Sequence, residues 1–294
     1  MKIKYSIGVS KIRFSYPGAS RIKIKGNTEC DFLDIKEINV TSALIKPTSS
    51  ETSEVTGPGI DYALDPYVGC QHACKYCYSF RKQFLDKPET SHAQDLWGDF
   101  VDLKVNIAEV LTTEINHTKR GGVLLSALTD PYQPLEHKYR ITRSCLQVLL
   151  KRQYRVIILT KSDLVNRDLD LLTQFKNADV GLTITTDDDN IRQIIEPYSS
   201  SIEDRITTLR TFHSRKVTTY VHIGPILPMN PEALVNQITD QIDYAIIDKM
   251  NYITPELEEL YQRNGFGYAL DDEYFKAKEG ELRKRFERNN IKIW

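Results

Sequence analysis

The sequence predicts an α/β fold: a partial parallel (β/α)6 TIM-like barrel with a small N-terminal β element and a C-terminal helical extension. Short apolar runs rich in β-branched residues alternate with amphipathic stretches of helical period. The apolar runs show little polar alternation, which indicates strands buried on both faces, as in parallel sheets. The chain has 294 residues, 27% of them charged, and a net charge of −1, which fits one large globular domain with an appendage and excludes a disordered or fibrous protein.

Residues 1–45 are expected to form the N-terminal β element. Three segments alternate polar and apolar residues, with Pro-Gly and Gly-Asn turn signals between or after them: Lys2–Val9, Lys11–Phe14 and Arg21–Lys25. Residues 46–59, rich in Ser, Thr, Gly and Pro, predict a linker. The element has a local excess of Lys and Arg, which is either a docking surface for an anionic substrate or the solvated face of a short sheet.

The barrel is expected over residues 60–252, and the chemistry of a parallel barrel lies at the C-terminal ends of its strands. Candidate strands are Tyr62–Leu64, Val123–Ala127, Val156–Thr160, Val180–Thr185, Val217–Ile223 and Tyr244–Ile247. Candidate helices are Ile107–His117, Thr142–Arg152, Arg167–Phe175, Ile202–His213, Pro231–Gln241 and Pro255–Asn264. Residues 253–294 are expected as helices that pack on the barrel.

Three of the five cysteines have the spacing Cys-x3-Cys-x2-Cys: Cys70, Cys74 and Cys77. In a reducing compartment, thiols this close together indicate a metal site rather than disulfides. A structural zinc site needs four ligands, so His72 would have to complete it. Three cysteines on a four-iron cluster leave one iron open, whereas Cys30 or Cys145 as a fourth ligand would give an electron-transfer cluster. The residues alone leave all three kinds of site possible.

The segment Asp65–Tyr78, Asp-Pro-Tyr-Val-Gly-Cys-Gln-His-Ala-Cys-Lys-Tyr-Cys-Tyr, resembles the cluster-binding segment of radical S-adenosylmethionine (SAM) enzymes, and within them the spore photoproduct lyase-like subfamily. Tyr76 is the aromatic residue before the last cysteine. Further matches extend the resemblance over residues 55–290: Thr129–Pro134, Leu159–Asp163, Arg167–Leu172, Glu196-Pro197 with Ile202–Arg205, Pro225–Pro228, Asp248–Tyr252 and Asp272–Tyr274.

The resemblance implies a [4Fe–4S] cluster, held by the three cysteines, that reductively cleaves SAM to a 5′-deoxyadenosyl radical, which abstracts hydrogen from a substrate. The candidate SAM-binding residues are Tyr76, Asp130, Lys161, Thr183, Thr185 and Arg205. The Lys161 ammonium suits the SAM carboxylate. Thr183 and Thr185 share one face of a strand, where they either hydrogen-bond to SAM or are ordinary β-branched strand residues. Arg205 either binds SAM or caps a helix.

Tyr78 and Tyr132 are the candidate catalytic residues, as relays of hydrogen atoms or as stacking partners of the substrate. Spore photoproduct lyases use a cysteine before the Thr-Asp segment to quench the product radical, and here Ala127 stands where that thiol would align. Cys145 lies in an apolar helical segment and is expected in the core. Repair of thymine dimers is therefore doubtful, and the substrate is a nucleic acid by analogy, or else a peptide or small metabolite.

The family implies a reductant protein of the flavodoxin or ferredoxin type. No apolar run approaches a membrane span, and the N-terminus has no apolar signal core, so we expect a cytoplasmic protein without a membrane partner. An electron-transfer iron–sulfur protein and a structural zinc protein are the alternatives to a radical SAM enzyme.

Overall fold

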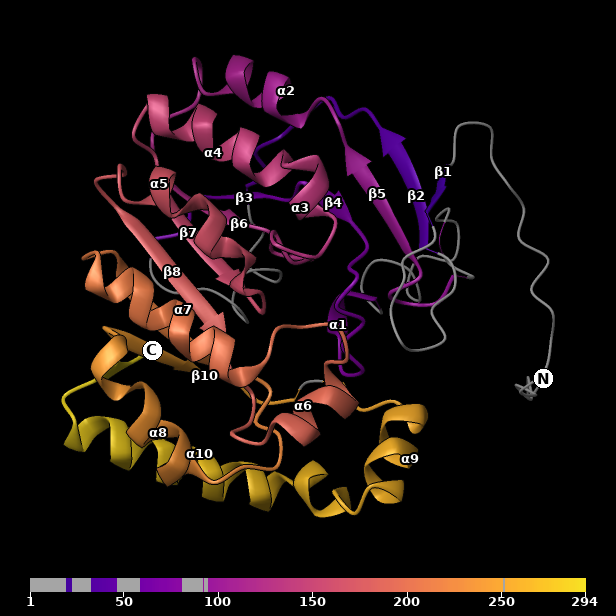
Figure 1. Cartoon of the computed structure of the whole chain (residues 1–294), viewed down its shortest axis with the longest axis vertical. Helices are drawn as coiled ribbons and strands as arrows, with labels where there is room; N and C mark the ends of the chain where they lie inside the picture. Colours follow the sequence, from indigo (N-terminus) through magenta and orange to yellow (C-terminus); the bar gives the residue numbers. More distant parts are fainter. Residues whose placement is uncertain (1–19, 23–32, 47–58, 81–91, 93–94, 251) are drawn as a thin grey trace.

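The computed structural model describes residues 20–22, 33–46, 59–80, 92, 95–250 and 252–294 (Figure 1). Its centre is a seven-stranded sheet in the order β11-β10-β9-β8-β7-β6-β3, in which every neighbouring pair is parallel. The strands are β3 Tyr62–Leu64, β6 Gly122–Leu125, β7 Arg155–Thr160, β8 Ala178–Thr183, β9 Thr218–Ile223, β10 Tyr244–Ile247 and β11 Lys292–Ile293. Within the described chain the edge strands β3 and β11 do not pair, so the barrel is open, and the predicted α/β class is confirmed.

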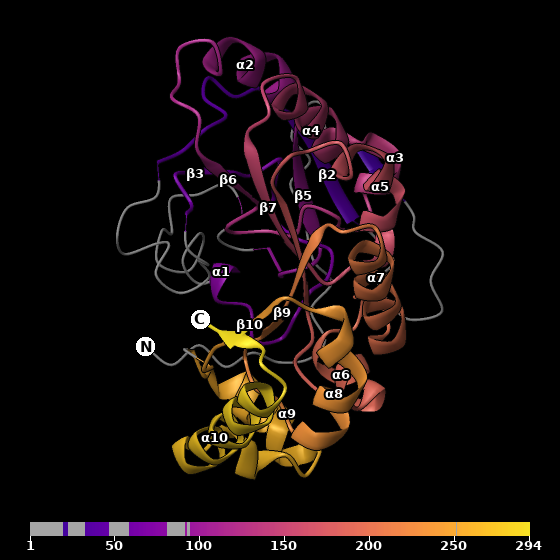
Figure 2. The same cartoon turned by 90° about the vertical axis from the view of Figure 1, so that its left-hand side faces the viewer.

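Helices cover the outer face of this sheet (Figure 2). They are α2 Ile107–Glu114, α4 Ile141–Lys151, α5 Leu169–Leu172, α7 Ile202–Ser214, α8 Pro231–Ile238 and α10 Asp272–Arg288. The remaining helical segments are α1 Tyr78–Phe80, α3 Glu136–Tyr139, α6 Asp189–Ile195, α9 Pro255–Arg263, η2 Asp163–Asp168, η3 Thr239–Gln241 and η4 Gly267–Leu270. Side-chain caps fix the starts of α7, α8 and α9, where Ser201, Asn230 and Thr254 accept hydrogen bonds from the first turn.

The strands bury both faces, as their continuous apolar runs indicate. Val221 and Ile223 of β9 point outward into the core under the helices, whereas Tyr220 lies on the opposite face, in a small cluster inside the barrel. The Tyr220 ring lies over Gly181 of β8, where an added Cβ would come within 2.2 Å of the ring. The Tyr220 hydroxyl donates to the carbonyl of Ile158, 3.0 Å away. The cluster around Tyr220 fills the interior of the barrel. The C-terminal ends of the strands lie above it and form the floor of a pocket.

A second sheet has the order β1-β2-β5-β4, with bounds β1 Ser20–Ile22, β2 Leu33–Ile38, β5 Phe100–Lys104 and β4 Tyr67–Val68. The pair β1–β2 is antiparallel as predicted, but β2 pairs in parallel with β5, and β4 is antiparallel to β5. The N-terminal strand β2 therefore pairs with β5, which follows the cysteine loop, and β5 pairs in turn with β4, which precedes it. Segments Lys2–Val9 and Lys11–Phe14, most of the linker and Cys30 lie outside the described residues, and the domain limits at 45, 59 and 252 stay a prediction.

Several boundaries differ from those predicted. The strand predicted to reach Ala127 ends at Leu125, because Ser126 takes a left-handed backbone, with φ 63°. The helix predicted over 167–175 is a 3₁₀ segment followed by one α-helical turn, and begins earlier, at the cap Ser162. The C-terminal extension is helical as expected and closes with the strand β11. No helix among the described residues is long and apolar enough to cross a membrane.

Candidate active site

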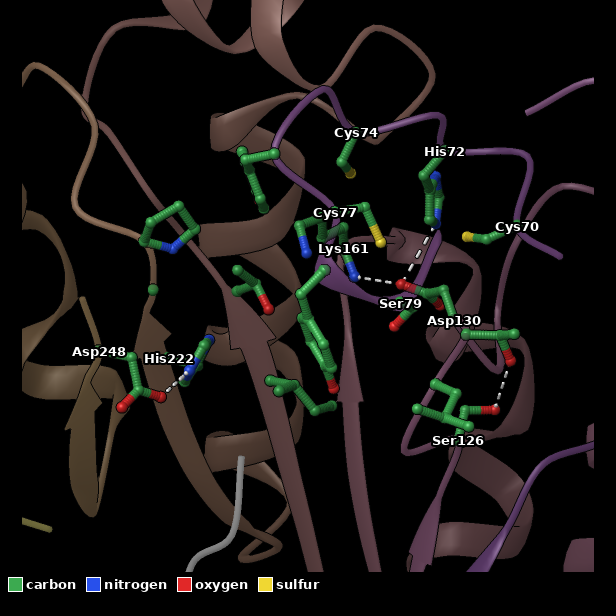
Figure 3. Close-up of a pocket in the computed structure, with 18 of the residues that line it drawn as sticks. Cys70, His72, Cys74, Cys77, Ser79, Ser126, Asp130, Lys161, His222 and Asp248 are labelled. Carbon is green, nitrogen blue, oxygen red and sulfur yellow. Dashed lines mark hydrogen bonds and ion pairs between the residues drawn. The ribbon is translucent and has the colours of Figure 1, made fainter. Parts of the chain in front are cut away.

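One pocket opens at the C-terminal ends of the parallel strands, and it collects most of the predicted site residues (Figure 3). The cysteine loop after β4 forms one wall. The segments that follow β6, β7, β9 and β10, together with the end of β8, form the rest. The predicted residues that line it are Cys70, Cys74, Cys77, Tyr76, Tyr78, Asp130, Lys161 and Thr183. The predicted placement of the site at the strand ends is what the parallel topology requires.

The cysteine loop is held by bonds that do not involve its thiols. Gln71 donates its backbone N–H to the Gln133 side chain, at 3.0 Å, and accepts the N–H of Leu135 on its own side chain, at 2.6 Å. The N–H of Lys75 donates to the carbonyl of Ile195, at 2.9 Å. Gly69, with φ 81°, packs so closely that a Cβ would lie 2.5 Å from the Phe100 carbonyl, so glycine is required there.

The three thiols fit a cationic group. Cys70 and Cys74 are buried, and burial, followed by neighbouring negative charge, raises the pKa of Cys70. Burial also raises the pKa of Cys74, to about 12, although Lys161 opposes this shift. Buried thiolates are therefore unfavourable here without a bound positive centre, which iron supplies. Among the described residues no three His, Cys, Asp or Glu side chains are arranged to hold a single ion.

Asp130 ties the loop after β6 to β7 and to the cysteine loop. Its carboxylate accepts from the N–H groups of Tyr132 and Lys161, both at 2.8 Å, and from the Thr160 hydroxyl at 2.6 Å. His72 Nε2 lies 3.2 Å from Oδ2 of Asp130. Burial would raise the pKa of Asp130, but these partners outweigh it and lower the pKa to about 2. Asp130 is thus an anion that lines the pocket and positions its walls.

A second buried carboxylate, Glu196, lies under the cysteine loop. It accepts hydrogen bonds from the hydroxyls of Tyr76 and Thr185, the latter at 2.9 Å, and its Oε2 lies 2.7 Å from Arg205. Glu196 and Arg205 are fully buried. Burial opposes ionisation, but the charges of Arg205 and Lys161 and the bond from Tyr76 lower the Glu196 pKa to about 2.

Lys161 lines the pocket together with Lys249, which is paired with Asp272. Its Nζ lies 5.6 Å from the centre of the Tyr76 ring, and no protein acceptor in the described chain is within hydrogen-bond reach of it. Burial lowers the pKa of Lys161, but the nearby charges of Cys74, Glu196 and Asp130 raise it by more. The net shift of the pKa is upward, so the side chain stays an ammonium. A carboxylate ligand in the pocket would find an unengaged cation.

The structure separates the remaining predicted residues. Thr183 lines the pocket, whereas the Thr185 side chain is turned to Glu196. Arg205 donates to the carbonyls of Thr183 and Ser200, at 2.8 and 2.9 Å, besides pairing with Glu196, so its guanidinium is used within the protein rather than at the pocket surface. Arg205 also belongs to α7, but it is not the cap of that helix.

The two candidate catalytic tyrosines lie in different places. Tyr78 lines the pocket and donates its hydroxyl to the carbonyl of Ala127, 2.9 Å away. Tyr132 is fully buried outside the pocket, where its hydroxyl lies 3.2 Å from Asp168 and its ring lies beside Arg167. The expectation that Tyr132 meets the substrate is therefore not supported, because the chain turns at Asp130 and directs the Tyr132 side chain into the core.

Sequence reasoning missed His222 and Asp248, which line the pocket from β9 and from the residue after β10. His222 Nε2 lies 2.6 Å from Oδ2 of Asp248. His222 stands two residues from Tyr220 in β9, and this period of two puts both inside the barrel. That alternation is the signal that was available, but the apolar neighbours of His222 indicate only a buried strand.

Comparison with known proteins agrees with this geometry. The sequence profile of the Radical SAM superfamily matches residues 64–238, more than half of the chain. The chain belongs to the radical SAM superfamily. Members of that family bind a [4Fe–4S] cluster and SAM, and the pocket holds the thiol set that such a cluster needs.

Two relatives illustrate the sequence likeness. An uncharacterized protein of Methanocaldococcus jannaschii is 39% identical over 171 residues, which are 58% of this chain and 62% of the relative. An uncharacterized protein of Acidianus two-tailed virus is 31% identical over 202 residues, 66% of each chain. The chain thus spans less than two thirds of the length of either relative.

Among solved structures, spore photoproduct lyase complexed with dinucleoside spore photoproduct has a TM-score of 0.63 at 16% identity, covering 92% of this chain and 86% of that one. A mutant of the same lyase with bound AdoMet and the dinucleoside has a TM-score of 0.62 at 17% identity. These likenesses show a shared fold.

Proposed function

We propose that this radical SAM enzyme holds a [4Fe–4S] cluster on Cys70, Cys74 and Cys77, cleaves SAM reductively, and abstracts a hydrogen atom from a nucleic-acid substrate. The observation that carries the first part is the pocket itself: three thiols and one unengaged ammonium, that of Lys161, face the same space. The space measures ≈ 990 Å³ with its open mouth included.

The electron-transfer alternative requires a fourth cysteine at the cluster. Cys145 is fully buried in α4, in the core between helices and sheet, and does not line the pocket. Burial, followed by the charge of Glu136, raises the pKa of Cys145, which suits a core thiol. Cys30 lies outside the described residues. Among the cysteines that the structure describes, three therefore face the pocket, which supports an open coordination site.

When bound, the cluster and SAM supply a 5′-deoxyadenosyl radical. The protein groups bind and orient. Lys161 pairs with the SAM carboxylate, and Tyr76, held by Glu196, places its ring beside that ammonium. Asp130 fixes the segment after β6 and the backbone of Lys161 relative to the cysteine loop.

The walls of the pocket also favour a planar aromatic substrate. Tyr78, Trp97 and Tyr252 line it, and nucleobases stack on such side chains when they leave a duplex or come from a single strand. The lyase with the same fold was solved with a dinucleoside, which supports this substrate class by analogy. Ala127 stands in the wall where the lyase-like subfamily carries its quenching thiol, so we expect a reaction other than that repair.

The test is anaerobic. The protein is reconstituted with iron and sulfide, reduced with dithionite and given SAM, and 5′-deoxyadenosine is quantified with and without single-stranded DNA, duplex DNA, RNA or a peptide mixture. We expect cleavage in the wild type and in Cys145→Ala. Each of Cys70→Ala, Cys74→Ala and Cys77→Ala should reduce it by at least about 100-fold, because each removes a cluster ligand.

The outcomes separate the candidates. Stimulation of cleavage by a nucleic acid, weakened by salt, supports the proposed substrate. Stimulation by the peptide mixture alone would replace nucleic acid by the peptide alternative. A complete four-iron cluster that never cleaves SAM would refute the enzyme activity and favour electron transfer, and bound zinc in place of iron would favour a structural site.

A further inference from the structure

The pocket has a polar pair on the wall that faces the cysteine loop, and the proposed radical chemistry does not use it. His222 projects from β9 and Asp248 follows β10, and Figure 3 shows the pair across the pocket from the cysteines. His222 Nε2 and Asp248 Oδ2 are 2.6 Å apart. A carboxylate at this distance accepts a proton held on Nε2, which leaves Nδ1 as the ring nitrogen that can accept a hydrogen bond.

That second nitrogen is the unusual feature. The His222 side chain is 9% exposed, and Nδ1 is buried without a hydrogen-bond partner among the described residues. A buried polar atom left unpaired costs about 1–3 kcal/mol, which a ligand group that pairs with it would recover. A structural histidine in a core normally has both nitrogens satisfied. The arrangement therefore favours a ligand.

The neighbouring backbone makes room for the pair. Gly224 lies against it, and a Cβ at that position would come within 2.5 Å of His222 Cε1 and 2.8 Å of the Asp248 Cβ. His222 is aligned with Thr183 of β8 in the sheet register, and both line the pocket. The ring is thus fixed by the carboxylate on one side and by the sheet on the other, so its free nitrogen has a defined direction.

We propose that His222, oriented by Asp248, is the specificity-determining acceptor of the substrate site and takes a neutral N–H or O–H donor of the substrate on Nδ1. In a nucleic acid, the imide N–H of a uracil or thymine base is such a donor. This inference rests on the proposed function, because it assigns one wall of the pocket to substrate and leaves the cysteine and Lys161 wall to the cofactor.

The test uses the oxidised holoenzyme with SAM and the probe 2′-deoxyuridine, whose imide N–H is the simplest donor of this kind. N3-methyl-2′-deoxyuridine, which lacks the N–H, is the matched ligand. We expect the wild type to bind the first about tenfold more tightly than the second. His222→Ala should bind the two equally, Asp248→Asn should lose part of the preference, and SAM affinity should stay within twofold. His213→Ala, a histidine on α7 outside the pocket, should behave as wild type.

Nitrogen-15 spectra of the histidines add a readout that a structural role would not move. We expect neutral His222 to carry its proton on Nε2, and the Nδ1 resonance to shift when deoxyuridine is added. Equal binding of the two nucleosides to the wild type, a proton on Nδ1, or a loss of SAM affinity in His222→Ala with the preference intact would each overturn the assignment. Failure of the proposed function appears separately, as absence of SAM cleavage in the wild type.

Discussion

Glu196 joins three separate segments of the chain behind the pocket wall. Its carboxylate accepts hydrogen bonds from Tyr76 of the cysteine loop and from Thr185 after β8, and it forms an ion pair with Arg205 of α7. Three separate parts of the chain therefore meet at one carboxylate. Because that carboxylate and its guanidinium partner are both fully buried, removal of either leaves an uncompensated charge in the protein interior.

We predict that Glu196→Gln lowers the free energy of unfolding at pH 7 by about 3 kcal/mol. The folded-state pKa of Glu196, about 2, is below its usual value of 4.5, so its stabilising effect is complete above pH 4.5 and is lost as the pH falls toward 2. The gap between variant and wild type should close over that range. Urea denaturation at several pH values measures it, and a gap independent of pH would contradict the role of this carboxylate.

At this scale the sequence predicted some residues and not others. The spacing of the cysteines is local, so it was sufficient to predict three thiols on one pocket wall, and a strand end predicted Lys161. Glu196 lay in a matched segment, but its partners, like that of His222, become visible only when α6, α7, β9 and β10 are packed together. Tyr132 was misplaced because a motif gives the order of residues but not the direction of each side chain.

Between elements, β8 fits tightly against β9. Gly181 has no side chain, and the Tyr220 ring occupies the space, with its hydroxyl bonded to the Ile158 carbonyl of β7. One aromatic residue thus spans three adjacent strands directly below the pocket. The register of those strands fixes Thr183 beside His222.

We predict that Gly181→Ala lowers the free energy of unfolding by about 2–3 kcal/mol, because its Cβ would lie 2.2 Å from Cζ of Tyr220 and the ring has no free space to enter. Gly280→Ala in α10 is the control, since a Cβ there meets nothing within 4 Å, and we expect it to be neutral or to stabilise the helix by up to about 1 kcal/mol. Equal effects in thermal denaturation would argue against the close contact.

Six of the seven barrel strands, all except β11, were predictable because they are largely apolar and are bounded by polar residues. The strands β2 and β5 were not, because β2 alternates buried and part-exposed residues and pairs with a partner some sixty residues away, Asp34 with Phe100. The 3₁₀ segment over Asp163–Asp168 was not predicted for another reason. Its start is set by the side-chain cap at Ser162 and not by the spacing of apolar residues.

At the scale of the whole molecule, the last helix and strand pack against the barrel. The helix α10 packs on α8, with Leu282 and Phe286 fully buried, and Tyr274 receives the N–H of Met229 at 3.0 Å. The strand β11 then pairs with β10 at the sheet edge. Residues at the end of the chain therefore support the strands that carry His222 and Asp248.

We predict that Phe286→Ala lowers the free energy of unfolding by about 3–5 kcal/mol, since it empties a fully buried aromatic site. Val105→Ala, at a side chain 45% exposed, should cost less than about 1 kcal/mol. Guanidinium denaturation followed by circular dichroism distinguishes them, and a Phe286→Ala variant as stable as Val105→Ala would show that the C-terminal helix is dispensable.

The hydrogen bonds that hold the cysteine loop have a consequence for variants that lack one of its thiols. Gln71, Lys75 and Tyr76 are anchored to Gln133, Ile195 and Glu196 without any contribution from sulfur. We therefore expect the loop backbone to keep its place when a single thiol is removed, because these hydrogen bonds remain. Loss of SAM cleavage in such a variant would then report the missing thiol rather than a displaced loop.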